Sequence, residues 1–128
     1  MARLRDIMRS ARSLPNASYC PDVDEIVKIS FDPQAGREQA ERRWAIVLSP
    51  RMYNEKSRLC VVCPITTKVK GYPFEVPLPN GHQVEGVVLA DQVKSMSWEA
   101  RNAEYICQSP NGLSAKVRAM VKALIRII

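Results

Sequence analysis

The feature of this chain that most constrains its fold is a succession of short segments rich in β-branched and aromatic residues, each ended by a turn signal. Asp32-Pro33, Ser49-Pro50 and Pro79-Asn80-Gly81 are such turn signals. Short strands at this spacing are typical of a small barrel or sandwich, so the chain is predicted to be mainly β. The predicted strands cover residues 25–31, 44–48, 59–65, 73–77, 86–90 and 105–108.

The last segment of the chain predicts an amphipathic helix. Apolar residues recur there at helical spacing, with basic residues elsewhere around the helix: Leu113, Val117, Val121, Leu124 and Ile128, with Lys116, Arg118, Lys122 and Arg126. Ser109 is the predicted N-cap and Pro110 the first helical residue, although Gly112 weakens that first turn. Residues 1–14 also place apolar residues at helical spacing among arginines, which fits a docked helix, a basic arm or a frayed extension.

Length and composition limit the class of protein. A chain of 128 residues predicts one hydrophobic core, and 46% hydrophobic with 25% charged residues is the balance of a globular protein rather than a disordered or membrane one. The chain has no run of eighteen apolar residues and no signal-peptide pattern, so we expect a cytoplasmic protein without membrane contact. A net charge of +6 favours a polyanionic partner, such as nucleic acid or an acidic protein segment, although the charge alone is a weak signal.

Four cysteines, at positions 20, 60, 63 and 107, raise the question of a metal site because Cys60 and Cys63 form a C-x-x-C pair. That pair lies in an apolar run typical of a buried strand. The chain has no second C-x-x-C and no ligand-spaced histidine to complete a zinc site. We therefore expect buried, reduced thiols, and no metal or cofactor.

Seven segments, in their order along the chain, give the strongest indication of function. They closely resemble the MazF/PemK toxins of type II toxin–antitoxin systems: Ile29-Ser-Phe-Asp-Pro33, Glu38-Gln39, Arg42-Arg43, Ala45-Ile-Val-Leu-Ser-Pro50, Cys63-Pro-Ile-Thr-Thr67, Lys70-Gly-Tyr-Pro-Phe-Glu-Val76 and Gly86-Val-Val-Leu-Ala-Asp-Gln-Val-Lys-Ser95. The resemblance extends over residues 21–128, which form the predicted toxin domain. Residues 1–20 are an extension outside it.

The resemblance implies a small SH3-like barrel of the CcdB/PemK type, with short helices, that works as a homodimer. It implies an endoribonuclease that cuts single-stranded RNA at short sequences without a metal, and that is inhibited by a cognate MazE-like antitoxin. In the family the arginine after the Glu-Gln loop and the threonine of the Pro-x-Thr segment form the catalytic pair, which here are Arg43 and Thr66.

The chain departs from the family pattern in two places. The family usually has Gly-Asp before the first strand and proline after the catalytic arginine, whereas this chain has Asp24-Glu25 and Trp44. Both departures leave the presumed catalytic pair in place. Trp44 adjoins Arg43 and is expected to influence its direction, so these positions bear on activity more than on fold.

The chemistry of these residues suits RNA cleavage. RNA supplies its own nucleophile, the 2'-hydroxyl, so an enzyme needs to orient it, move protons and stabilise charge on phosphorus. We assign Arg43 to electrostatic stabilisation through its planar fork, and Thr66 to a hydroxyl hydrogen bond on the same phosphate. Glu38 either accepts the 2'-hydroxyl proton or holds Arg43 in place, and we favour holding. His82, the only histidine, excludes a two-histidine mechanism and is interpreted as a turn residue.

Other residues near the catalytic motifs are predicted to contact RNA through charge, hydrogen bonds or stacking: Gln39, Arg42, Trp44, Thr67, Lys68, Lys70 and Tyr72. Without the resemblance, the charged loop would be interpreted as a solvated connection and Thr66 as an ordinary strand-end residue. Two other functions stay open. One is a catalytically impaired member that binds RNA or antitoxin, and the other is a gyrase-binding toxin of the related CcdB type.

Overall fold

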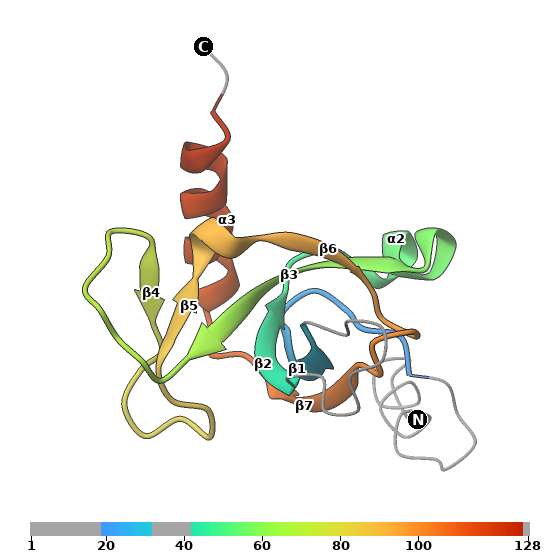
Figure 1. Cartoon of the computed structure of the whole chain (residues 1–128), viewed down its shortest axis with the longest axis horizontal. Coiled ribbons are helices and arrows are strands. Elements are labelled where there is room, and N and C mark those ends of the chain that lie inside the picture. The colour runs from blue at the N-terminus through green and yellow to red at the C-terminus, as the bar shows by residue number, and fades with distance from the viewer. Residues whose placement is uncertain (1–18, 32–41, 127–128) are drawn as a thin grey trace, which may run out of the picture.

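The computed structural model describes residues 19–31 and 42–126 of the chain. The elements in these residues are mostly strands (Figure 1), in the following order: β1 Glu25–Ser30, β2 Arg42–Val47, α2 Arg51–Ser57, β3 Leu59–Thr66, β4 Glu75–Pro77, β5 Val87–Leu89, the 3-10 helix η1 Ala90–Gln92, β6 Lys94–Ser97, β7 Glu104–Gln108 and α3 Leu113–Leu124. No helix in this part of the chain is long and apolar enough to cross a membrane.

The strands form one antiparallel sheet with the order β4-β5-β3-β2-β1-β7, and β6 pairs with β3 beside this path. β3 pairs along one edge with β2, and along its other edge with β6 at its start and β5 at its end. The path ends at β4 and β7 without closing, although the sheet is strongly bent (Figure 1). The predicted mainly β class is confirmed, with an open sheet in place of a closed barrel.

The three central strands are buried on both faces, because alternate residues enter two separate clusters. In β1, Ile26 packs on the α3 side while Val27 and Ile29 pack on the other side. β2 alternates in the same way. The α3-side cluster consists of Ile26, Ile46, Cys63, Ile65, Val76, Leu78, Val84, Val88, Ala90, Leu113 and Val117. The opposite cluster consists of Val27, Ile29, Phe31, Ala45, Val47, Cys60, Val62, Met96 and Trp98.

The two cysteines of the C-x-x-C pair lie on opposite faces of β3, since residues three apart in a strand point to opposite sides. Cys63 belongs to the α3-side cluster and Cys60 to the other. Burial raises the pKa of both thiols to about 12. Because they point to opposite sides of β3, the two thiols are not placed to form a disulfide with each other, and both are free and buried, as the sequence predicted.

α3 packs on the sheet along most of its length, since Met120 and Val121 in its second half also pack, partly buried, against the α3-side cluster. Leu113 and Val117 are buried, whereas Leu124 is 42% exposed, and the C-terminal end projects away from the sheet (Figure 1). Ile128 lies outside the described residues. The predicted helix start was wrong: Gly112, in the left-handed conformation with φ 83°, is the N-cap, and the backbone N–H of Ser109 instead donates to the carbonyl of Asp24 at 2.8 Å.

The elements that the sequence did not predict are α2, η1 and β6. β6 has one buried side chain, Met96, and exists because its backbone pairs with the start of β3. The polar connection after β1 was predicted to reach residue 43, but β2 already begins at Arg42, so Arg42 and Arg43 are strand residues with opposite orientations.

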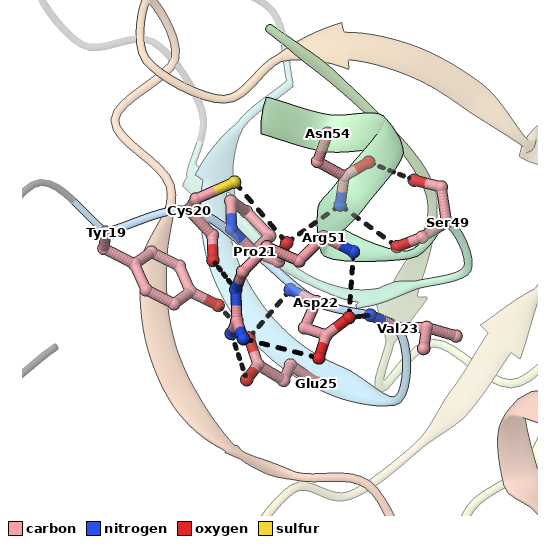
Figure 2. A network of polar contacts seen from close by, with 9 residues as sticks. All are labelled: Tyr19, Cys20, Pro21, Asp22, Val23, Glu25, Ser49, Arg51 and Asn54. Atoms are coloured by element: carbon pink, nitrogen blue, oxygen red, sulfur yellow. Dashed lines mark hydrogen bonds and ion pairs between the residues drawn. The ribbon is translucent and has the colours of Figure 1, made fainter. Parts of the chain in front are cut away.

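A buried polar network fixes α2 to the segment before β1 (Figure 2). The Asn54 side-chain amide donates to the carbonyls of Pro21 at 2.8 Å and Ser49 at 3.0 Å, and its oxygen accepts from the Ser49 hydroxyl at 2.6 Å. The Arg51 guanidinium lies between Asp22, at 3.6 Å, and Glu25, at 3.4 Å. α2 is short and has no apolar face to pack on the sheet. These polar contacts fix its position instead.

The network also bears on the predicted domain boundary at residues 20 and 21. The Cys20 carbonyl accepts a hydrogen bond from Arg51 Nε at 3.1 Å, and the Tyr19 hydroxyl donates to Glu25 at 2.5 Å (Figure 2). Both residues also pack against the Trp98 side of the core. The packed part of the chain therefore includes Tyr19 and Cys20, while residues 1–18 of the predicted extension lie outside the described residues.

Candidate functional site

Two adjoining pockets open where β2 and β3 meet the loops around β4. The larger has a volume of about 640 Å³ and is lined by Arg42, Arg43, Trp44, Ile65, Thr66, Thr67, Lys68, His82, Gln83 and Glu85. The smaller, of about 200 Å³, is lined by Arg43, Thr66, Lys68, Lys70, Tyr72, Glu75, Leu89, Asp91 and Gln92. Arg43, Thr66 and Lys68 line both pockets. All the described residues that the sequence predicted for the site thus line one pocket or the other.

The strand register places the predicted catalytic pair side by side. Ala45 of β2 pairs with Pro64 of antiparallel β3, and two residues further along each strand are Arg43 and Thr66. Directly opposite residues of an antiparallel pair have their side chains on the same face and a few ångströms apart. A guanidinium and a hydroxyl are thereby presented together at the junction of the two pockets.

The backbone around Thr66 is tightly held. Its hydroxyl oxygen accepts a hydrogen bond from the backbone N–H of Lys68 at 3.1 Å, which leaves its proton directed elsewhere. Gly86, with φ 117°, lies against it, and a Cβ at that position would be 2.1 Å from the Thr66 carbonyl oxygen. A glycine is therefore required for β5 to approach the end of β3.

Arg43 rests on an aromatic ring. Its Cζ atom lies 5.6 Å from the centroid of Phe31, and the Lys94 ammonium lies 5.7 Å from the same centroid. Phe31 is buried, so it is a fixed platform. Cation–π attraction of this kind helps to orient a guanidinium.

The Arg42 side chain lies on the opposite face of β2 from the Arg43 side chain. Its guanidinium donates to Ser30 Oγ at 3.3 Å and to the carbonyls of Lys28 at 3.2 Å and Asn102 at 3.0 Å, and it pairs with Glu104 at 3.4 Å. These bonds tie β2 to β1 and β7. The sequence predicted an RNA contact for Arg42, and the contacts observed in the fold are those of a structural residue that lines the pocket.

The loop between β3 and β4 presents cationic and aromatic groups. Lys70 Nζ lies 5.9 Å from the Tyr72 ring centroid, and the Tyr72 side chain is largely exposed. The Glu75 carboxylate accepts from the backbone N–H groups of Lys70 at 3.0 Å and Gly71 at 2.9 Å. Glu75, which the sequence did not single out, holds this loop in shape.

Trp44 lines the larger pocket and is half-buried, since part of its ring packs against the α3-side core. It has the opposite strand orientation to Arg43. The substitution of tryptophan for the family's proline therefore leaves Arg43 on its platform beside Thr66. Asp24-Glu25, where the family usually has Gly-Asp, lies at the start of β1, whereas Arg43 lies beside the end of that strand.

The loop between β4 and β5 lines the larger pocket, although the sequence did not predict any of its residues for the site. His82 was interpreted as a turn residue, and it is one: its Nδ1 accepts the backbone N–H of Val84 at 3.0 Å. The same residue also lines the larger pocket, with Gln83 and Glu85. The loop lies between two of the motifs, at residues 70–76 and 86–95, but nothing in its own sequence indicates that it lines the pocket with β2 and β3.

Two predicted residues, Glu38 and Gln39, lie outside the described residues. Residues 19–31 and 42–126 bring together no cluster of three or more His, Cys, Asp or Glu side chains that could hold a metal ion.

Fold and site together define a small, mainly β protein with an arginine–threonine pair in an open basic pocket. The chain belongs to the PemK-like, MazF-like toxins of type II toxin–antitoxin systems, which it matches over residues 23–127. It is 54% identical over 85 residues, 66% of this chain, to Endoribonuclease toxin MazF of Escherichia coli K12, and the match covers 76% of that protein.

Solved structures agree with this assignment. A structure of MazF from Deinococcus radiodurans superposes with a TM-score of 0.78 at 45% identity, covering 86% of this chain and 100% of that one. A chain in a structure of MazE-MazF from the same organism gives a TM-score of 0.76 at 40% identity, covering 87% of this chain and 100% of that one.

Proposed function

We propose that this chain is a toxin endoribonuclease that cuts single-stranded RNA at short specific sequences without a metal ion. The observation that supports this most is the cross-strand placement of Arg43 and Thr66, which line both pockets. The relatives at 54% and 45% identity are named Endoribonuclease toxin MazF and MazF, which favours the same activity here. This pairing also favours an active enzyme over an impaired family member or a gyrase-binding toxin.

The proposed step is an in-line displacement on the scissile phosphate. The 2'-oxygen forms a bond to phosphorus, the bond from phosphorus to the 5'-oxygen breaks, the 2'-hydroxyl proton passes to a base and the leaving oxygen takes up a proton. The products are a 2',3'-cyclic phosphate and a 5'-hydroxyl. Arg43 binds the non-bridging oxygens as charge develops, and Thr66 donates its hydroxyl to the same group. Glu38 holds Arg43 or accepts the proton.

The RNA backbone would cross the junction of the two pockets. Lys68, which lines both, and Lys70 are placed to attract phosphates, and Tyr72 is exposed enough to stack a base. Thr67 and Trp44 line the larger pocket, and Gln39 is assigned to RNA from the sequence alone. Arg42 would act on RNA indirectly, by holding β2.

We further propose a cognate MazE-like antitoxin, a homodimer as the working form and a cytoplasmic site of action, where messenger RNA is found. A MazE-MazF complex among the similar structures supports the antitoxin. Exposed apolar side chains such as Leu124 and Ile125 favour self-association. Sedimentation at micromolar concentration should give twice 14.4 kDa, and a monomer that cleaves at full rate would contradict the dimer.

The experiment that tests the activity is incubation with a long mixed-sequence RNA in excess chelator, followed by mapping of both fragment ends. We expect specific cuts with cyclic phosphate and 5'-hydroxyl ends. A strict need for Mg²⁺, or 5'-phosphate ends, would contradict the proposed mechanism.

A further inference from the structure

The walls of the larger pocket carry opposite charges. Arg43 and Lys68 belong to the β2–β3 wall, whereas Glu85 belongs to the loop between β4 and β5. A carboxylate repels phosphates, so an RNA strand in this pocket would place its backbone against the basic wall. The base attached to that backbone would then face the loop.

The loop presents its side chains from a fixed backbone. Val84 is fully buried in the α3-side core, and its neighbours Gln83 and Glu85 are exposed and line the pocket. Two hydrogen bonds of 3.0 Å close the loop. The Val84 N–H donates to His82 Nδ1, and the Leu78 N–H donates to the Gly86 carbonyl. Groups held in this way lose little freedom when a ligand binds.

Within the part of the chain that the structure describes, the Glu85 carboxylate makes no hydrogen bond or ion pair, and Gln83 makes no side-chain hydrogen bond. An ionised carboxylate only accepts hydrogen bonds. Adenine, cytosine and guanine each offer an exocyclic amino group as a donor. Uracil offers one N–H between two carbonyl oxygens, and those oxygens would face the carboxylate.

We propose that Glu85 is a specificity-determining residue that selects an amino-bearing base and rejects uracil at one position of the RNA site, with Gln83 beside it as a second contact. This inference rests on the proposed function for the nature of the ligand, single-stranded RNA. It assigns Glu85 no part in the bond-breaking step.

The test is a single-stranded RNA pool with a randomised central segment, presented to the parent protein, to Glu85→Gln and to Glu55→Gln. Glu55→Gln is the matched control, since it removes the same charge from an exposed position on α2, outside the pocket. Bound RNAs and cleaved ends are sequenced separately. Because a good base contact discriminates by about 1 to 3 kcal/mol, the parent should disfavour uracil at one position by about 5- to 150-fold.

In Glu85→Gln the amide both donates and accepts, so discrimination against uracil should disappear at that position while preferences elsewhere stay. Glu55→Gln should keep the parent's profile. An unchanged profile in Glu85→Gln, or the same relaxation in Glu55→Gln, would overturn the inference. If the parent binds the pool with a base preference but cleaves nothing, the proposed function is contradicted instead. The sequences of the bound RNAs would then still test whether Glu85 selects the base.

Discussion

At the residue scale, the proposed chemistry depends first on Arg43, because its guanidinium would meet charge that develops only in the transition state. Losing one preorganised donor of this kind costs about 3 to 4 kcal/mol in comparable sites. Arg43→Ala should therefore lower the single-turnover cleavage rate about 100- to 1000-fold, with a smaller loss of RNA affinity. Arg43→Lys should restore little, since an ammonium lacks the planar fork.

Thr66→Ala gives an internal comparison for this prediction. One neutral hydrogen bond contributes less than a charged fork, so the rate should fall less than in Arg43→Ala. Parental cleavage in Arg43→Ala, or affinity that falls in proportion to rate, would show that Arg43 does not stabilise the transition state.

Asp24 explains how the chain departs from the family pattern at a position that usually holds glycine. Its φ of 74° is left-handed, a conformation that aspartate tolerates better than most residues. In return its carboxylate accepts a hydrogen bond from the Ser114 hydroxyl and lies 3.6 Å from Arg118, so it ties the start of β1 to α3. The departure adds a contact to the fold and lies away from the pocket.

Asp24→Ala should accordingly destabilise the protein by about 1 to 3 kcal/mol, because alanine adopts this conformation poorly and makes no contact to α3. Asp24→Gly should cost about 1 kcal/mol or less, since glycine accepts the backbone angle and loses only an exposed ion pair and a hydrogen bond. Equilibrium unfolding in urea measures both. A glycine variant less stable than the alanine variant would refute the backbone argument.

At the element scale, α2 is an element that the sequence could not predict. A seven-residue helix with no apolar stripe gives no periodic signal. Its position depends on Asn54, whose side chain makes three buried hydrogen bonds and whose carbonyl accepts from Trp98 Nε1 at 3.0 Å. A buried asparagine in a polar sequence is indistinguishable from an exposed one until the structure is known.

Asn54→Ala should lower the free energy of unfolding by about 2 to 4 kcal/mol, because two buried carbonyls lose the amide that donates to them and the Ser49 hydroxyl loses the acceptor of its proton. Met52→Ala on the same helix is the control, with an expected change within about 0.5 kcal/mol, since Met52 is 72% exposed. Chemical denaturation of both variants gives the comparison. Similar losses in the two would mean that helix propensity, not the network, decides the stability.

The approach of β5 to the end of β3 predicts the effect of a small substitution. Gly86→Ala would place a Cβ 2.1 Å from the Thr66 carbonyl oxygen, so the Thr66 backbone must shift. We expect a loss of about 2 kcal/mol or more in stability and slower cleavage. Gly81→Ala has a similar positive φ but no atom within 4 Å of the new Cβ, so cleavage should stay near the parental rate.

At the scale of the whole molecule, the order of motifs predicted the family, and through it the fold and half of the residues that line the two pockets. The β-branched runs located six strands to within two residues at each end. Three features depended on contacts between distant segments: the open strand path, the register that brings Arg43 beside Thr66, and the loop that places Glu85 in the pocket. Such pairings are set by packing across the sheet and leave no local pattern in the sequence.

The net charge of +6 is also a property of the whole molecule, and only part of it is placed where RNA would bind. Each phosphate contact on a single strand contributes about 0.7 to the slope of log affinity against log salt. Lys68 lines both pockets, whereas Lys56 lies on α2, at the other end of the molecule from β4 and β5 (Figure 1).

Lys68→Ala should therefore weaken RNA binding and reduce the magnitude of that slope by about 0.7, while Lys56→Ala, with the same change in net charge, leaves the slope at the parental value. The measurement is a salt titration of affinity for a single-stranded RNA with a 2'-deoxy residue at the cleavage position, which prevents cutting. Equal slopes in the two variants would mean that attraction to RNA is spread over the whole surface. A smaller slope in Lys68→Ala alone would mean that the strand follows the junction of the two pockets.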